Sequence, residues 1–126
     1  GFLVAVVAKL AIAVTMLAFT AFHRPHLAPT DPELCLLAQG MICLGPATRA
    51  GCGSLCPGGN MPCTGCFGPT SRVRDQGAKA MSSICANLAP KEEGEIDAVL
   101  DGIPDPVGTF YRYGLARSLL RRRTDL

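Results

Sequence analysis

The feature that most constrains this chain is a run of four closely spaced cysteines, Cys52-x3-Cys56-x6-Cys63-x2-Cys66. Glycine allows tight turns and a close approach of the backbone, and proline adds stiffness without an amide group that would need a partner. Each cysteine has such a neighbour: Gly51 and Gly53 flank Cys52, Pro57 follows Cys56, Pro62 precedes Cys63 and Gly65 precedes Cys66. The pattern predicts that four thiolates converge from one compact loop.

Four thiolates are the ligand set of a [4Fe-4S] cube, with one thiolate for each iron. Tetrahedral zinc accepts four cysteines as well, so a zinc knuckle is the alternative. A disulfide framework fits less well, because the 7 cysteines are an odd number and their spacings are short. With 14 Gly, 10 Pro and no Trp, much of the chain must form turns and loops, and we expect a bound inorganic group to order residues 35–69.

A second pair of cysteines, Cys35 and Cys43, cannot complete a cluster, because two thiolates leave two ligand positions open. The nearest candidates for these positions are His23 and His26, since histidine is an accepted iron–sulfur ligand. Two ordinary surface histidines are the alternative. Cys85 follows Ile84 in a predicted helix, and there we expect it to pack as a small apolar residue.

Residues 2–22 are apolar except for one lysine and two threonines, and this length suffices to span a bilayer as a helix. The segment is rich in alanine and has Lys9 well inside it, which favours a helix buried against protein instead. Both interpretations stay open. Residues 23–34 contain three prolines and read as a linker.

Helical spacing returns after the cysteine-rich region. We predict a helix with Thr70 or Ser71 as its N-cap and Pro90 as its stop, followed by a short pattern over Ile96–Leu100. The expected apolar face of the first helix consists of Val73, Gly77, Met81, Ile84 and Leu88. A last amphipathic segment is expected over Val107–Leu120, with Phe110, Tyr111, Tyr113 and Leu119 as its packing groups.

Two stretches of sequence carry a family resemblance. The string CLLAQGMICLGPATRAGCGSLCPGGNMPCTGCFGP, followed by DQGAKAMSSIC, closely resembles the C-terminal region of [NiFe]-hydrogenase small (delta) subunits. The most similar types are the methyl-viologen-reducing (F420-non-reducing) and sulfhydrogenase subunits of the NADH:ubiquinone oxidoreductase 20 kDa-subunit-like family. The resemblance covers Pro32 to about Leu88 and returns in the tail GTFYRYGLA.

The resemblance implies two clusters. Cys52, Cys56, Cys63 and Cys66 match the ligands of the family's medial cluster, and Cys56 stands where some relatives have proline and a [3Fe-4S] centre, so a [4Fe-4S] cluster is expected. Cys35 and Cys43 match two ligands of a distal cluster. The family supplies its other two ligands from an upstream Cys-x-x-Cys or His-x-x-Cys, whereas this chain has His23-x-x-His26, with His23 at the family's histidine position.

The resemblance also implies a fold: a mostly irregular, cluster-stabilised loop region with a few α-helices. The family's N-terminal flavodoxin-like α/β domain is absent from these residues. Residues 2–14 would be that domain's last helix if the sequence is the C-terminal part of a longer chain. If they form an anchor, the chain is a truncated derivative attached to a membrane complex. The expected organisation is an apolar helix (1–22), a linker (23–34), an iron–sulfur region (35–69) and a helical region (70–126).

The function that follows from the resemblance is electron transfer between a catalytic large subunit, which holds the nickel–iron centre, and an acceptor or donor partner. No catalytic dyad or phosphate-binding motif is visible, so no bond-making site is expected on this chain. The net charge of +2 is too small to suggest a nucleic-acid partner. The expected location is cytoplasmic, with membrane association through residues 2–22 under the anchor interpretation. The alternative function is a zinc-stabilised interaction module of a larger complex.

Overall fold

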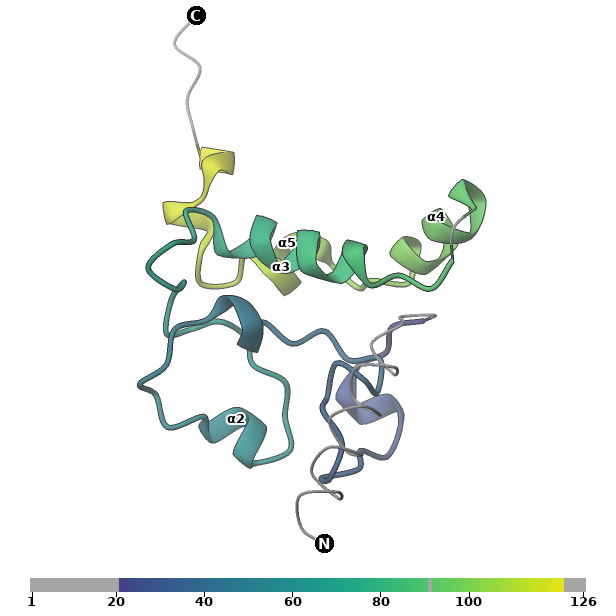
Figure 1. Ribbon diagram of the computed structural model, residues 1–126, viewed down its shortest axis with the longest axis horizontal. Coiled ribbons are helices and arrows are strands. Elements are labelled where there is room, and N and C mark those ends of the chain that lie inside the picture. The colour runs from purple at the N-terminus through teal and green to yellow at the C-terminus, as the bar shows by residue number, and fades with distance from the viewer. Residues whose placement is uncertain (1–20, 91, 122–126) are drawn as a thin grey trace, which may run out of the picture.

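The computed structural model describes residues 21–90 and 92–121. This part of the chain consists of short helices joined by turns (Figure 1), and an isolated antiparallel bridge joins Thr48 and Pro69. With η for a 3-10 helix, the order is η1 (Pro25–Leu27), η2 (Gly45–Ala47), α2 (Leu55–Gly58), α3 (Gln76–Ala86), α4 (Glu93–Asp101), α5 (Pro106–Phe110), η3 (Leu115–Arg117) and η4 (Leu119–Arg121).

The longest described helix, α3, begins after Asp75 and not after Thr70 or Ser71, so the predicted N-cap is wrong. The Asp75 carboxylate accepts a hydrogen bond from the Ala78 amide at 3.0 Å. It also accepts one from the Leu119 amide at 3.1 Å, which no local pattern could indicate. A carboxylate at this position satisfies free amides and interacts favourably with the helix dipole.

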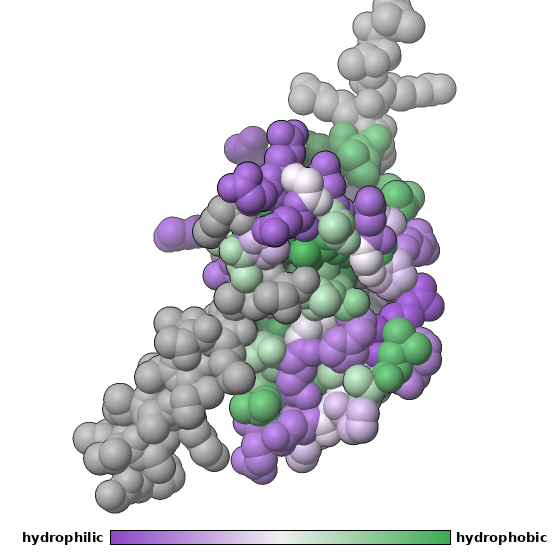
Figure 2. All heavy atoms as spheres, turned by 90° about the vertical axis from the view of Figure 1, so that its right-hand side faces the viewer, coloured by the Kyte–Doolittle hydropathy of each residue, from purple (hydrophilic) through white to green (hydrophobic). Residues whose placement is uncertain are grey.

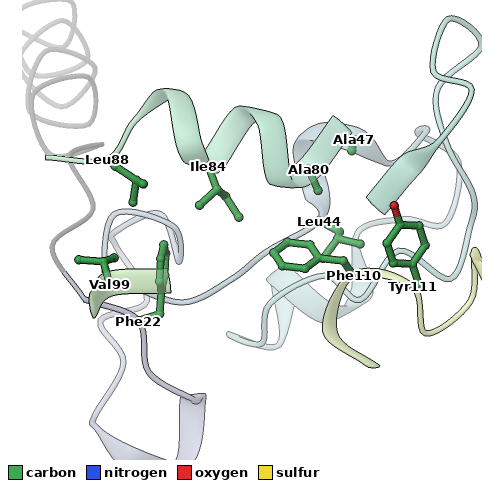
Figure 3. Packing of buried hydrophobic residues seen from close by; sticks show 9 residues of the cluster. All are labelled: Phe22, Leu44, Ala47, Ala80, Ile84, Leu88, Val99, Phe110 and Tyr111. Atoms are coloured by element: carbon green, nitrogen blue, oxygen red, sulfur yellow. The ribbon is translucent and has the colours of Figure 1, made fainter. Parts of the chain in front are cut away.

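The core lies beneath α3 (Figure 3). Ala80 and Ile84 lie four residues apart, so they share one face of the helix and point into the core. Leu88, two residues after the end of α3, is buried in the same core. The remaining core members come from α4, α5, η2 and the loops: Phe22, Leu44, Ala47, Val99, Phe110 and Tyr111. The predicted apolar face of this helix is confirmed at its buried positions Gly77 and Ile84, whereas the predicted members Val73 and Leu88 lie outside α3.

Cys85 does not pack in this core, and the prediction that it would is wrong. Its side chain is exposed, whereas that of Ile84 is only 4% exposed. Successive residues of an α-helix differ by about 100° around the axis, since there are about 3.6 residues per turn. Adjacency to Ile84 therefore places Cys85 on a different face.

The predicted amphipathic segment over Val107–Leu120 is not a single helix. The first part forms α5, which begins after Asp105, and the chain then breaks before η3 and η4. Phe110 and Tyr111 are buried as expected, but Tyr113 is 57% and Leu119 60% exposed. After the break, the Leu119 amide donates to Asp75 and holds this part of the chain at the start of α3.

The helix α4 agrees with the short pattern predicted over Ile96–Leu100 and extends it at both ends. Val99 is buried, and Ile96 and Leu100 pack partly against the core. Acidic residues occupy the exposed positions of α4, and the face of the molecule on this side is largely hydrophilic (Figure 2). Glu93 and Glu95 lie in its first turn, where negative charge favours a helix.

The apolar segment 2–22 lies almost entirely outside the described residues, so its two interpretations are not addressed. Of its members only Ala21 and Phe22 are described, and Phe22 is buried in the core. Among residues 21–90 and 92–121, no helix combines the length and the apolar character that crossing a membrane requires.

Close packing at Gly77 gives a test of the core. A Cβ at Gly77 would lie 2.7 Å from two ring atoms of Tyr111, so Gly77→Ala must displace the ring. We expect a loss of about 1–3 kcal/mol in the free energy of unfolding, the range for overpacking. Urea unfolding followed by far-ultraviolet circular dichroism measures it.

The matched control for Gly77→Ala is Gly94→Ala in α4, where a Cβ would meet no atom within 4 Å. Because alanine favours a helix over glycine, this variant should be unchanged or more stable by up to about 1 kcal/mol. Equal stability of the Gly77 and Gly94 variants would show that α3 and Tyr111 are not packed as described.

The Asp75 carboxylate gives a pH test. Burial acts to raise its pKa, but hydrogen bonds from the Ala78 and Leu119 amides and from the Tyr111 hydroxyl bring the pKa below its ordinary value. The stabilisation is therefore fully present above the unfolded pKa of about 3.9 and is lost as the pH falls through the folded value.

Asp75→Asn should lower the free energy of unfolding at pH 7 by about 0.5–1 kcal/mol, the range for a carboxylate at a helix N-terminus. It should also flatten the decline in stability below about pH 4. Urea unfolding from pH 7 down to about pH 2 compares it with the parent and with Asp97→Asn, an exposed residue of α4. An acid decline in Asp75→Asn that equals the parent's would contradict the assignment.

Candidate metal centre

The loop that carries the four-cysteine run is closed where its two ends meet. Beside the Thr48–Pro69 bridge, the Arg49 amide donates to the Gly68 carbonyl at 3.0 Å. Arg49 Nε donates to the Phe67 carbonyl at 2.8 Å, and its guanidinium lies 4.8 Å from the centre of the Phe67 ring. These contacts hold the loop as the ring that contains α2 in Figure 1.

The first half of this loop turns at residues with a left-handed backbone conformation. Gly51 has φ +128°, and a Cβ there would lie 2.9 Å from the Phe67 ring, so only glycine fits. Ser54 follows with φ +53° and begins α2. After α2 the Met61 amide donates to the Cys56 carbonyl at 2.9 Å and closes the turn. Local turn geometry therefore presents Cys56 from a short, rigid element.

The four cysteines of the run line one cavity of about 360 Å³. Cys63 is half-buried at its inner side, while Cys52, Cys56 and Cys66 are exposed. Across the described residues, no three His, Cys, Asp or Glu side chains come close enough together to hold a metal ion, so the thiols share the cavity without meeting at one point. The donor set is that of a [4Fe-4S] cube or of zinc, and its placement around one cavity fits such a group.

The sulfur of Cys63 has polar neighbours on both sides. The Gly65 amide donates to it at 3.4 Å, and the Thr48 hydroxyl oxygen lies 3.7 Å away. Thr48 in turn donates to the Leu44 carbonyl at 2.7 Å and accepts from Gln76 Nε2 at 2.9 Å. The first residue of α3 therefore positions a hydroxyl beside this cysteine.

Cys43 lies beside the backbone of Cys63. The Cys63 amide donates to the Cys43 sulfur at 3.2 Å, and the Leu44 amide donates to the Cys63 carbonyl at 2.9 Å. Burial raises the pKa of the Cys43 thiol, although hydrogen bonds from the Gly45 and Cys63 amides oppose this, and the charges of Cys63 and Cys35 add to the rise. Two cysteines predicted for different clusters are thus neighbours.

The predicted distal residues are only partly brought together. Cys35 is exposed at the start of a turn, and its negative charge contributes to the raised pKa of Cys43. The His23 amide donates to the Gly40 carbonyl at 3.0 Å, and its ring packs against Gly40. His23 and His26 line a cavity of about 270 Å³ whose lining includes Cys63 but neither Cys35 nor Cys43.

Several residues of the site could not be predicted from the cysteine spacing. Arg49, Phe67, Thr48 and Gln76 shape the cavity or the Cys63 environment, yet none is a metal-ligand type. The contact between Thr48 and Gln76 joins residues 28 positions apart, and that between Arg49 and Phe67 joins residues 18 apart. Only the frequent glycines around the cysteines indicated that close backbone contacts were needed.

Comparisons with known proteins agree with the resemblance. No family model matches the chain. The G subunit of the F420-non-reducing hydrogenase from Methanothermus fervidus is 45% identical over 95 residues, which are 74% of this chain and 75% of that protein. The protein of the same name from Methanothermobacter marburgensis is 46% identical over 92 residues, 71% of this chain and 30% of that protein.

A third relative is named for its cofactor. The iron-sulfur G subunit of the F420-non-reducing hydrogenase from Archaeoglobus profundus is 39% identical over 100 residues, which are 79% of this chain and 30% of that protein. The chain therefore spans less than a third of the length of two of these three relatives, and the family named from the cysteine run is confirmed. By its identity to the Methanothermus protein across three quarters of that protein's length, the chain belongs to the family of F420-non-reducing hydrogenase G subunits.

Proposed function

We propose that this chain relays electrons in a hydrogenase-type oxidoreductase complex through a [4Fe-4S] cluster held by Cys52, Cys56, Cys63 and Cys66. The observation that carries the proposal is that all four cysteines line one cavity. When bound, the cluster would accept and release one electron at a time. The hydrogenase family and the iron–sulfur name of a relative agree with this role.

The iron–sulfur name of a relative favours a cluster over zinc. The cavity of about 360 Å³ has room for a group larger than a single ion. The zinc-stabilised interaction module is therefore the less favoured function. It would use the same four thiols, so metal analysis decides between the two.

The chain's own residues would tune the negative charge on these sulfurs. The Gly65 amide donates to the Cys63 sulfur, whereas the Thr48 hydroxyl gives its proton to the Leu44 carbonyl and only lies near that sulfur. Donors aimed at a ligating sulfur stabilise its negative charge, and such bonds help to set the potential of the group. Arg49 also lines the cavity and brings a positive charge to it.

We further propose a second, distal cluster on Cys35 and Cys43, with His23 favoured over His26 as an additional ligand. Cys43 is half-buried, and the negative charge of Cys35 contributes to the raised pKa of the Cys43 thiol. The hydrogen bond to Gly40 holds His23 beside the turn that joins these cysteines. A neutral imidazole in place of a thiolate raises the potential of a cluster. The partners proposed from the family are a large subunit with the nickel–iron centre and a subunit that exchanges electrons with this chain.

Metal analysis tests the four-cysteine site. Protein purified without oxygen should be brown and contain at least about four iron and four sulfide per chain, one iron for each thiolate of the run. In Cys56→Pro the fourth iron loses its thiolate, so the content should fall by about one iron and the oxidised protein should show the electron paramagnetic resonance signal of a three-iron centre.

The matched control is Cys85→Ala, because Cys85 is exposed on α3 and lies outside the cavity. Its iron content and visible spectrum should equal those of the parent. Zinc without acid-labile sulfide in the parent would establish the alternative function, and an unchanged spectrum in Cys56→Pro would remove Cys56 from the ligand set.

Paired substitutions test the distal site. His23→Ala should abolish or shift a second signal in the electron paramagnetic resonance of the reduced protein, because one ligand of that cluster is lost. His26→Ala should leave the signal in place. The signal from the four-cysteine cluster serves as the internal control for folding. If both variants keep a second signal intact, or the parent has only one cluster, the histidines are not ligands.

A further inference from the structure

A further cavity, of about 420 Å³, shares part of its wall with the four-cysteine cavity. Arg49, Cys66 and Phe67 line both cavities. Arg74 and Arg117 also line the larger one, and among the residues that the structure describes no aspartate or glutamate lines it. Three arginines therefore line one space whose described walls hold no acidic residue.

The fold places these arginines from separate segments. Arg49 is fixed by the bond from its Nε to the Phe67 carbonyl and by the packing of its guanidinium against the Phe67 ring. A Cβ on Gly68 would lie 3.9 Å from Arg49 Nε and 4.0 Å from an Arg117 terminal nitrogen, so the two guanidiniums approach the same glycine. Arg74 directly precedes the N-cap of α3.

The nearest carboxylate along the chain cannot neutralise them. Asp75 is buried, and its oxygens accept hydrogen bonds from the Ala78 and Leu119 amides. The bond to Leu119 also fixes the segment that carries Arg117. The same contact that occupies the acid therefore builds the basic cavity.

The surroundings favour a protein ligand over a small anion. All three arginines are exposed, as is Tyr113, which lines the cavity with 57% of its surface accessible. Leu115, two residues before Arg117, is 46% exposed. Tyrosine and arginine dominate the energetics of protein interfaces, and the arginine fork matches a carboxylate with two parallel hydrogen bonds. A partner segment could cover these groups, whereas a small anion would leave them in water.

We propose that this cavity is the docking site for an acidic segment of a partner protein, whose carboxylates pair with Arg49, Arg74 and Arg117. The inference rests on the proposed function in one respect: the partner would be one that exchanges electrons with this chain. Cys66 stands in the shared wall, so a segment seated here is separated from the four-cysteine cavity by a single layer of side chains.

The test measures binding of fluorescein-labelled hexaglutamate to the full chain by fluorescence anisotropy at low ionic strength. The double variant Arg74→Gln/Arg117→Gln should weaken binding by about tenfold or more, because two charge-assisted pairs are lost. The matched control is Arg72→Gln/Arg112→Gln, which removes the same charge from exposed arginines outside the cavity lining and should change the affinity by less than about threefold.

Two outcomes would overturn the proposal: no binding of hexaglutamate, including the case in which calorimetry shows that inorganic phosphate binds through Arg74 and Arg117 instead, or an equal loss in both double variants. Iron content and the visible spectrum are recorded for every variant. If the parent holds a normal cluster but does not bind the peptide, the docking site is rejected and the electron-transfer function is retained. If the parent holds zinc but binds the peptide specifically, the docking site is retained and the electron-transfer function is rejected.

Discussion

The start of α3 is the junction on which the rest of the described structure depends. Asp75 caps the helix and binds the Leu119 amide, which ties the C-terminal segment to it. The next residue, Gln76, donates to Thr48, whose hydroxyl lies beside the Cys63 sulfur. Two consecutive side chains thus connect the apolar core, the basic cavity and the cysteine loop. A small core can position a large irregular loop in this way because the connection is made by directional hydrogen bonds.

The sequence predicted the interior of α3 well and its beginning poorly. Helical spacing marks Gly77 and Ile84 because both of them are buried on one side of the helix. The start of the helix depends on a residue 44 positions away, since Asp75 is a better cap than Thr70 once Leu119 and Tyr111 bind it. The error at Cys85 has a different origin: a neighbour in sequence was taken for a neighbour on the helix face.

In the candidate site, too, the sequence predicted some features well and could not indicate others. Cysteine spacing predicted that Cys52, Cys56, Cys63 and Cys66 serve one centre, and they line one cavity because short loops rich in glycine keep them close. Spacing could not reveal the Arg49–Phe67 wall or the Thr48 hydroxyl, which are set by tertiary contacts. The assignment of His23 and His26 to the distal site stays a prediction, since chain proximity alone does not determine where their rings point.

The four cysteines differ in how firmly the chain holds them, and this difference follows from where each contact originates. Cys63 is bonded through its backbone to Leu44 and Cys43, and its sulfur is flanked by groups fixed to α3. Cys52 and Cys56 lie on the outer part of the loop, where turns are local and the neighbouring Leu55 is 80% exposed. The inner cysteine is therefore the fixed point of the site. The outer part of the loop is held mainly by its own turns, such as the one that the Met61 amide closes at the Cys56 carbonyl.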